Sequence, residues 1–369
     1  MRVGINCRSF LKKTYTGIGR YAYNLVKSLG DIDQEDEYWL YAQKRFFDMK
    51  RQLPRAPAKN FAVKADYFNR GANKVLKGVD VYHSPSLDWI DVQGPKIVVT
   101  VHDLIHKTYP QGHTDETIQT VDQQLKEVVD KADKIICCSQ STCDDLHKYF
   151  DVDQNKTHVI YQGVDKDVFH PLDKAQQQQG RQALQTKKII SPFILSVGTI
   201  EPRKNLKNLF KAFAVLKKDK GFAGQLVVVG MKGWKMEGLQ KEIEDLGIQY
   251  DIVFCGYMAD RELCYLYNLC EVFVFPSFYE GFGFPIVEAF SCQAAVVTSN
   301  TSSCAEVAAD AALTVDPASS EEIAESIQRL LDDQALKGVL RDKAFERSQD
   351  FSFKKTAEET LKIYQGFKG

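Results

Sequence analysis

Two glutamates eight residues apart mark the stretch of this sequence with the greatest capacity for chemistry. The stretch runs from Phe275 to Ala289, passes from an apolar strand pattern through a glycine loop, and enters a helix that Pro285 is expected to start. Glu280 would lie on the loop and Glu288 in the first helical turn, at the carboxyl end of a parallel strand, where α/β sheets bind ligands. Two carboxylates beside bare amides suit a ligand with hydroxyls and a phosphate, such as a nucleotide sugar. The alternative is an ordinary turn followed by a first-turn acid.

A pair of adjacent cations forms a second candidate site. The run GTIEPRKN, from Gly198 to Asn205, follows a buried strand pattern, and Pro202 stands where a helix would begin. Arg203 and Lys204 are then expected in the first helical turn, where the helix dipole disfavours cations by about 0.3–1 kcal/mol. Two cations in that position imply an anion, and a diphosphate would satisfy both charges together with the free amides. The alternative is a solvated charged turn.

A glycine pair near the beginning of the chain is a third candidate. The sequence GIGRYA from Gly17 to Ala22, with Gly17 and Gly19 as its glycines, matches the GxGxx(G/A) pattern of dinucleotide-binding loops. About ten residues separate it from the first strand pattern, and the second strand pattern ends near Lys44 without an acid, so the match to a nicotinamide or flavin site is weak. Bare amides at a helix N-terminus can still bind phosphate, and an ordinary glycine turn is the alternative.

The fourth candidate is a histidine at a strand end. His102 follows the apolar run Ile97–Val101, so at the carboxyl edge of the sheet it would face the other domain. Asp103 beside it could orient the imidazole or bind an acceptor hydroxyl. Taken alone, His102 is equally consistent with a hydrogen-bonded residue that caps a strand.

The composition narrows the class of protein. A chain of 369 residues exceeds one ordinary hydrophobic core, which favours two domains. Its 48 basic and 49 acidic residues give a net charge of −1, so nothing in the overall charge motivates a nucleic-acid partner. The nine cysteines form no CxxC pair, which predicts reduced, buried thiols and no metal ligands. No apolar run approaches the ~20 residues that span a bilayer, so we expect a cytoplasmic protein.

Apolar runs rich in β-branched residues alternate with amphipathic stretches in both halves of the chain, which predicts the same parallel α/β architecture twice. A polar stretch between the halves predicts a hinge and a surface helix. The tail 352–367 is helical in period, with Phe353, Ala357, Leu361 and Tyr364 on one apolar face. The expected strands are Val3–Cys7, Tyr38–Ala42, Val79–His83, Lys96–Val101, Lys134–Cys138, His158–Tyr161, Phe193–Val197, Gln225–Val229, Ile252–Phe254, Val272–Phe275 and Ala295–Thr298.

One segment is far more basic than the nearly neutral chain as a whole. Residues 44–79 contain ten basic and two acidic side chains, a local charge of +8. Aromatic residues are interleaved with them: Phe46, Phe47, Phe61, Tyr67 and Phe68. Basic and aromatic surface together suit an anionic membrane or a polyprenyl diphosphate acceptor. A solvated face with core aromatics is an equal alternative.

Together these motifs resemble glycosyltransferase family 4, the retaining GT-B enzymes, over nearly the whole chain. The matching motifs are Glu280 to Glu288 with GFGFP between them, EPRKN from Glu201, GIGR from Gly17, VHDL from Val101, GVD from Gly163, Ser299-Asn300 and Asp316-Pro317. Gln293 and Ala295 depart from the family, which usually carries Gly and Pro there, and this departure concerns the identity of the donor.

The resemblance implies an α/β fold of the GT-B type, with two Rossmann-like domains whose parallel sheets face a central cleft. Residues 1–164 would form an acceptor-binding domain, and residues 165–349 a domain that binds the nucleotide sugar. The final helix, within 350–369, would cross back and pack on the first domain.

The resemblance also implies roles for the candidate residues. Arg203 and Lys204 would neutralise the donor diphosphate, and Gly17 and Gly19 would approach it from the other domain. Glu280 would bind the sugar hydroxyls. The remaining implied roles are backbone contacts of Gly281, Phe282 and Gly283 with the donor, ribose binding by Glu288, and a place near the reacting centre for His102 with Asp103.

The implied activity is retaining transfer of a hexose, of the mannose or glucose type, from a GDP- or UDP-sugar to a glycan or polyprenyl-linked acceptor. No cofactor and no metal are implied, and a peripheral contact with the inner face of a membrane stays open. Two alternatives remain at this point. One is a nicotinamide-dependent oxidoreductase built on the glycine pair, and the other is a non-catalytic nucleotide-sugar-binding protein.

Overall fold

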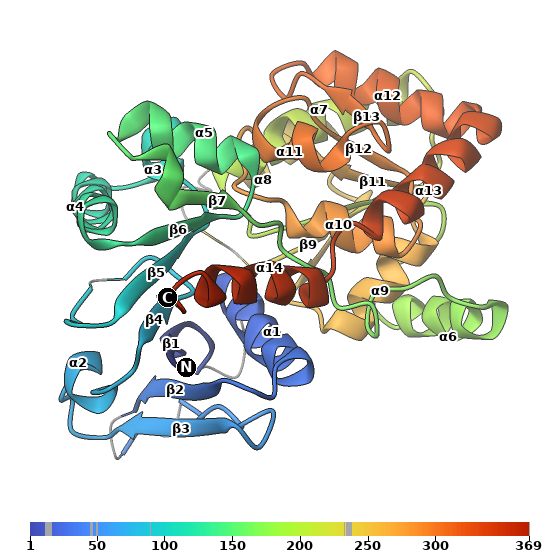
Figure 1. Cartoon of the computed structure of the whole chain (residues 1–369). Coiled ribbons are helices and arrows are strands. Elements are labelled where there is room, and N and C mark those ends of the chain that lie inside the picture. Colours follow the sequence, from blue (N-terminus) through green and yellow to red (C-terminus); the bar gives the residue numbers. More distant parts are fainter. Residues whose placement is uncertain are drawn as a thin grey trace. The chain divides into compact units, whose positions relative to one another are not determined.

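The computed structural model describes residues 1–11, 17–44, 47–48, 51–88, 90–231, 233 and 238–368. The chain forms two compact units (Figure 1). The first combines Met1–Gly163 with the tail Ser352–Gly369, and the second is Val164–Phe351. Each unit has its own parallel sheet covered by helices, and each is described separately below.

The first unit is built on a sheet of seven parallel strands in the order β3-β2-β1-β4-β5-β6-β7. The central strands are buried on both faces, as expected for a parallel sheet under helices. The strands are β1 (Arg2–Asn6), β2 (Glu37–Gln43), β3 (Phe61–Asp66), β4 (Val81–Ser84), β5 (Lys96–Val101), β6 (Lys134–Cys137) and β7 (Thr157–Val159). The α-helices are α1 (Gly17–Ile32), α2 (Ala72–Val75), α3 (Ile105–Thr108), α4 (Asp115–Lys131), α5 (Gln140–Tyr149) and α14 (Phe353–Gln365).

The second unit is built on six parallel strands in the order β10-β9-β8-β11-β12-β13. The strands are β8 (Phe193–Val197), β9 (Gln225–Val229), β10 (Ile252–Gly256), β11 (Val272–Phe275), β12 (Val296–Ser299) and β13 (Leu313–Val315). The helices are α6 (Lys174–Gln185), α7 (Leu206–Lys218), α8 (Leu239–Asp245), α9 (Asp260–Leu269), α10 (Phe284–Ser291), α11 (Ser302–Ala308), α12 (Ser320–Asp332) and α13 (Gln334–Ser348). Both sheets reverse strand order at their first strand, β1 or β8, which is the Rossmann-like winding predicted from the sequence.

Two strands were absent from the sequence prediction. β3 was missed because Lys64 interrupts its apolar pattern, and the structure shows why a lysine fits there. β3 is an edge strand, and the Lys64 ammonium lies 4.0 Å from the ring centre of Trp39 on the neighbouring strand. β13 was missed because it is only three residues long.

The C-terminal helix α14 belongs to the first unit, where it packs on α1. Thr356 and Thr360 complete its buried face, whereas Leu361, expected on that face, is only half-buried because it lies at the edge of the apolar stripe. The Thr356 hydroxyl donates a hydrogen bond to the carbonyl of Tyr161 over 2.8 Å. Gly163 permits the close approach of the two segments, since a Cβ there would lie 2.0 Å from the backbone nitrogen of Phe353.

None of the described helices is both long enough and apolar enough to cross a membrane.

Candidate active site

In the second unit, the carboxylate of Glu280 lies between the two predicted cations. Its Oε2 is 2.7 Å from the Arg203 guanidinium, and its Oε1 is 2.6 Å from the Lys204 ammonium. Arg203 also pairs with Glu201 at 2.5 Å. All four side chains are largely buried, with at most 16% of any of them exposed. The structure thus joins the EPRKN run and the glycine loop into one ion cluster, made of Glu201, Arg203, Lys204 and Glu280.

The sequence predicted that the two cations lie in the first turn of a helix that Pro202 starts. The structure differs. Pro202–Lys204 form a separate 3₁₀ turn, and α7 begins only at Leu206. Asn205 separates the two with a left-handed backbone, φ 58°, a conformation that asparagine tolerates better than most residues. Its side-chain amide donates to the carbonyls of Pro276 and Pro317, over 2.9 and 2.6 Å. Asn205 therefore ties the cationic turn to the loops that follow β11 and β13.

The charge that accompanies the two cations comes from the protein itself. Burial alone would raise the pKa of Glu280, but Arg203 and Lys204 outweigh burial and hold that pKa at about 2. Burial also lowers the pKa of the Lys204 ammonium, an effect that Glu280 opposes. Two glutamates and two cations balance formally. The position of the two cations therefore does not by itself imply an external anion, because Glu280 and Glu201 supply the negative charge.

Hydroxyl groups hold the backbone around Glu280, and the sequence analysis gave them no such role. Ser302 accepts a hydrogen bond from the Glu280 amide over 3.0 Å, and Ser303 donates to the Glu280 carbonyl over 2.9 Å. Ser299 donates to the Ser277 carbonyl over 2.6 Å. The signal in the sequence was the hydroxyl-rich run TSNTSS at the end of β12. These contacts fix the loop that carries Glu280 without using its carboxylate.

Glu288 lies deeper in its helix than predicted. Because α10 begins at Phe284, Glu288 is the fifth residue and belongs to the second turn, and it is 4% exposed. Its Oε2 accepts a hydrogen bond from the Tyr267 hydroxyl over 3.0 Å. Gly283 precedes the helix with φ 96°, a value that only glycine adopts without strain. Glu288 is the carboxylate predicted to bind the ribose. Its partner Tyr267 was not indicated by the sequence.

The donor-loop aromatic Phe282 is part of the core. Its ring is 5% exposed and packs edge-on against Phe284 and Phe351, with ring centres 5.5 and 5.8 Å away. Any contact between Phe282 and a ligand would therefore be made by its backbone, as would those of Gly281 and Gly283.

In the first unit, His102 directly follows β5 and is held through both ring nitrogens. Nε2 lies 2.8 Å from the carbonyl oxygen of Pro85, and Nδ1 lies 2.8 Å from the amide nitrogen of Gln162. Asp103 does not bond the imidazole. Its carboxylate instead accepts a hydrogen bond from the Ile105 amide, the first of α3, over 3.1 Å. The structure brings His102 together with Gln162, which the sequence analysis did not single out.

A buried hydrogen-bond chain lies beside His102. Tyr21 of α1 bonds Thr100 over 3.1 Å, and Thr100 bonds His83 Nε2 over 3.0 Å. His83 Nδ1 in turn bonds the hydroxyl of Tyr364 in α14. The Tyr21 ring also contacts the His102 ring edge-on, with ring centres 5.0 Å apart. These hydrogen bonds thus connect α1 and α14 to β5, the strand that His102 directly follows.

The predicted glycine pair stands at the start of α1, which begins at Gly17. Gly17 is exposed and Gly19 is buried. The residues before them, 12–16, lie outside the described part of the chain. Tyr21, two residues beyond Gly19, links this helix start to His102 within one unit.

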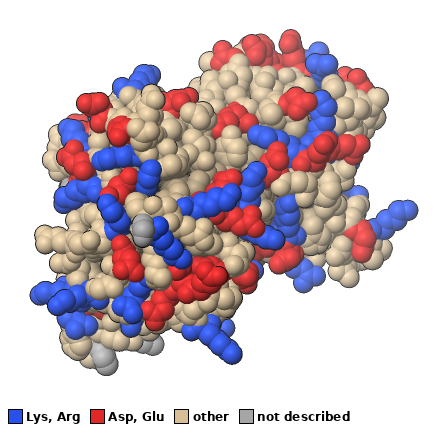
Figure 2. Space-filling view, in the orientation of Figure 1, with Lys and Arg blue, Asp and Glu red and all other residues tan. Residues whose placement is uncertain are grey.

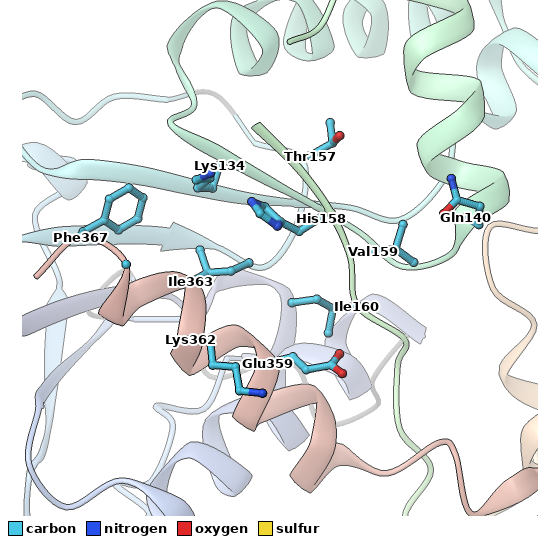
Figure 3. Close-up of a pocket in the computed structure, with 11 residues that line it drawn as sticks. Lys134, Gln140, Thr157, His158, Val159, Ile160, Glu359, Lys362, Ile363 and Phe367 are labelled. Carbon is cyan, nitrogen blue, oxygen red and sulfur yellow. The ribbon is translucent and has the colours of Figure 1, made fainter. Parts of the chain in front are cut away.

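A cavity of about 690 Å³ in the first unit lies between β6, β7 and the C-terminal helix (Figure 3). His158 of β7 and Ile363 and Phe367 of the tail line it, with Lys134 and Lys362 among its cations. None of the predicted site residues lines this cavity. Within the described ranges, no group of three or more His, Cys, Asp and Glu side chains is arranged to hold a metal ion.

The basic segment has two kinds of aromatic residue. Phe61 is buried and stacks on Tyr38, with ring centres 4.4 Å apart. Phe47 and Phe68 are 92% and 76% exposed, and Tyr67 is exposed to a smaller extent. Phe46 lies outside the described residues. Figure 2 shows lysine and arginine side chains at the lower left, where Figure 1 places β3 and α2, with acidic side chains beside them.

Two family models match the chain and together span most of it. One, described as Glycosyl transferases group 1, matches residues 180–347, and the other, described as Glycosyltransferase Family 4, matches residues 15–168. The winding of both units and these matches define a glycosyltransferase of the GT-B fold. The chain belongs to glycosyltransferase family 4, which excludes the oxidoreductase alternative.

Individual relatives agree with this assignment. The O-antigen chain mannosyltransferase B of Escherichia coli is 28% identical over 374 residues, covering 96% of this chain and 97% of that protein. A sucrose-phosphate synthase from Thermosynechococcus elongatus matches 99% of this chain and 98% of its own, with a TM-score of 0.78 and 19% identity. Anabaena HepE, solved with UDP and glucose, matches 98% of this chain and 99% of its own, with a TM-score of 0.75 and 18% identity. The two solved structures show the fold.

Proposed function

We propose that this glycosyltransferase moves a hexose of the mannose type from a nucleotide diphosphate sugar to a glycan or lipid-linked acceptor, with retention of anomeric configuration and without a metal. The observation that carries the proposal is the ion cluster in the second unit, where Arg203, Lys204 and Glu280 converge at the carboxyl ends of β8 and β11. The choice of mannose rests on likeness to the E. coli mannosyltransferase over nearly the whole chain.

The cluster suits a leaving nucleoside diphosphate. Two fixed cations stabilise the negative charge that develops as the glycosidic bond breaks, which is the role that a metal plays elsewhere. Glu280 holds both cations in place before the donor arrives, so little reorganisation is needed. Because the pKa of Glu280 is about 2, its carboxylate stays ionised near neutral pH and accepts hydrogen bonds from sugar hydroxyls. It is therefore not a proton donor in this proposal.

We propose for each unit the binding role that the family resemblance implies. The second unit would bind the donor through Arg203, Lys204 and Glu288, and the first would bind the acceptor near His102. Gly17 and Gly19, at the start of α1, stay predicted phosphate-binding residues of the first unit.

Release of nucleoside diphosphate from GDP-mannose, in the presence of a mannose-containing acceptor and excess EDTA, tests the proposal. We expect turnover in EDTA and an α-linked product from the α-linked donor, read by NMR of the anomeric proton. Parallel reactions with UDP-glucose and other donors identify the sugar. A β-linked product, or turnover that EDTA abolishes and magnesium restores, would contradict retention or metal independence respectively. No turnover with any nucleotide sugar would favour the binding-protein alternative.

A contact with an anionic membrane is a second proposal for the basic segment. It rests on the exposed ring of Phe68, which lies close in sequence to the exposed cations Arg70, Lys74 and Lys77. An aromatic ring inserts at a membrane interface while nearby cations attract anionic lipid.

Neutralising Arg70, Lys74 and Lys77 together should weaken binding to phosphatidylglycerol vesicles. At about 1 kcal/mol per cation, the loss is about 3 kcal/mol, or roughly a hundredfold. Co-sedimentation at low and high salt measures the effect, since salt screens the attraction. The matched control neutralises Lys211, Lys218 and Lys220, which are exposed in the second unit. Equal losses in both triple variants, or no vesicle binding by the unaltered protein at low salt, would remove the proposal.

A further inference from the structure

Gln162 is a buried amide at the point where the chain leaves the first sheet. It lies three residues after the end of β7, and only 1% of it is exposed. Its side-chain nitrogen is 2.8 Å from Nδ1 of His102. Its side-chain oxygen is buried and has no hydrogen-bond partner among the described residues. The contact with His102 is therefore what orients this amide.

The two contacts of His102 define which ring nitrogen carries hydrogen. The carbonyl oxygen of Pro85 can only accept, so Nε2 must be the protonated nitrogen. In a neutral imidazole the other nitrogen, Nδ1, is then a bare acceptor, and it requires a donor such as the Gln162 amide. In an imidazolium both nitrogens would donate, and the amide of Gln162 would have to turn its oxygen toward the ring.

The surroundings favour the neutral ring. Burial lowers the pKa of His102, and the backbone carbonyl of Pro85 and the charge of Asp103 oppose this effect only in part. The nearby His83 is buried with a pKa of about 3, so it is neutral. Tyr21 stays protonated because burial raises its pKa. The Cys138 thiol and the Thr142 hydroxyl both donate to the His102 carbonyl, over 2.9 and 3.4 Å.

We propose that Gln162 is a positioning residue that holds His102 as a neutral imidazole, with its Nε2 hydrogen bonded to the Pro85 carbonyl. Both ring nitrogens are then engaged by the protein, so His102 acts by presenting a fixed ring and not by accepting a proton. This inference rests on the proposed function for placing His102 near the reacting sugar. The state of the ring itself is a property of the ligand-free protein.

Nitrogen NMR of protein labelled with ¹⁵N-histidine tests the state of the ring without turnover. His102→Asn identifies the resonances among those of the seven histidines. We expect a bare Nδ1 and a protonated Nε2 throughout the range from about pH 5 to 8, in which an ordinary histidine titrates. Protonation at Nδ1, or titration of His102 within that range, would overturn the proposal even if the protein is a fully active transferase.

Gln162→Glu supplies the opposite case. A carboxylate can accept from Nδ1 but cannot donate to it, so His102 should become an imidazolium near neutral pH, and kcat should gain a pH dependence in that range. Gln162→Leu removes the donor alone and should lower kcat about tenfold, the effect of one lost buried hydrogen bond. Gln119→Glu, on the exposed face of α4, adds the same charge as a control. Unchanged His102 resonances in Gln162→Glu would also overturn the proposal.

Different results would contradict the proposed function and the role of Gln162. If the proposed function is wrong, no variant shows hexosyl transfer, yet the ring of His102 still has the stated form and still responds to Gln162→Glu. If only the role of Gln162 is wrong, transfer is measured but neither the resonances nor the pH profile respond to substitution. Melting curves of each variant show whether the fold persists.

Discussion

Lys204→Ala and Arg203→Ala should each lower turnover roughly 10²–10³-fold, the effect of removing one preorganised charge from a developing negative charge. Each cation contacts Glu280, at 2.6 Å for Lys204 and 2.7 Å for Arg203, so both are fixed before the donor binds. The loss should appear in kcat as well as in kcat/KM, because the contact strengthens as the diphosphate departs. Initial rates with a saturating donor measure it.

Both variants should still fold. Each leaves Glu280 with one remaining cation, although Arg203→Ala also takes from Glu201 its ion-pair partner and should lower the melting temperature more than Lys204→Ala does. Lys207→Ala is the matched control, because Lys207 lies next to the same turn but is 65% exposed and pairs with Glu242 at 3.5 Å. It should keep full activity, since exposed ion pairs contribute little. Full turnover of either cluster variant, with an unchanged melting curve, would show that the cations do not act on a diphosphate.

Arg203, Lys204 and Glu280 could be predicted as site residues from the sequence, but the part of Glu201 and the contacts among the four could not. Strand patterns such as Phe193–Val197 and Val272–Phe275 were placed at their observed bounds, because buried parallel strands are continuous apolar runs. Both loops that carry the cluster follow these strands. That Glu280 bonds Arg203 and Lys204 depends on how two loops 76 residues apart approach, and no local pattern encodes that distance.

Buried polar groups account for most of what was missed. Asn205, Tyr267 and Gln162 each satisfy a partner far away in the chain, which a single sequence does not reveal. Periodicity arguments identify the apolar face of a helix, so they explain α14 apart from its two threonines. They say nothing about which polar side chain meets which carbonyl.

The second large effect concerns the carboxylate itself. Glu280→Gln leaves Arg203 and Lys204 buried with Glu201 as their remaining acidic partner in the cluster, so the free protein should lose about 3–5 kcal/mol of stability. Turnover should fall as well, because the sugar hydroxyls lose their acceptor. Glu325→Gln, exposed on α12, makes the same change as a control and should be silent.

The loss of stability should depend on pH in a defined direction. The pKa of Glu280 is depressed in the folded protein, from an ordinary value of 4.5 to about 2. Its contribution is therefore complete above pH 4.5 and is lost as the pH falls toward 2, where the folded form also takes up the proton. The difference in unfolding free energy between the unaltered protein and Glu280→Gln should shrink over that window. A constant difference would mean that the carboxylate charge is not what stabilises the cluster.

Nucleotide binding separates the two glutamates. A bare nucleoside diphosphate should bind Glu280→Gln at least as tightly as the unaltered protein, because its phosphates replace a competing carboxylate beside Arg203 and Lys204. It should therefore raise the melting temperature of Glu280→Gln by at least as much as that of the unaltered protein. Glu288→Gln should instead weaken the nucleotide itself, since Glu288 is proposed to hold the ribose. Thermal shift and calorimetry with GDP and UDP distinguish these outcomes, and equal weakening in both variants would contradict the division between sugar and ribose.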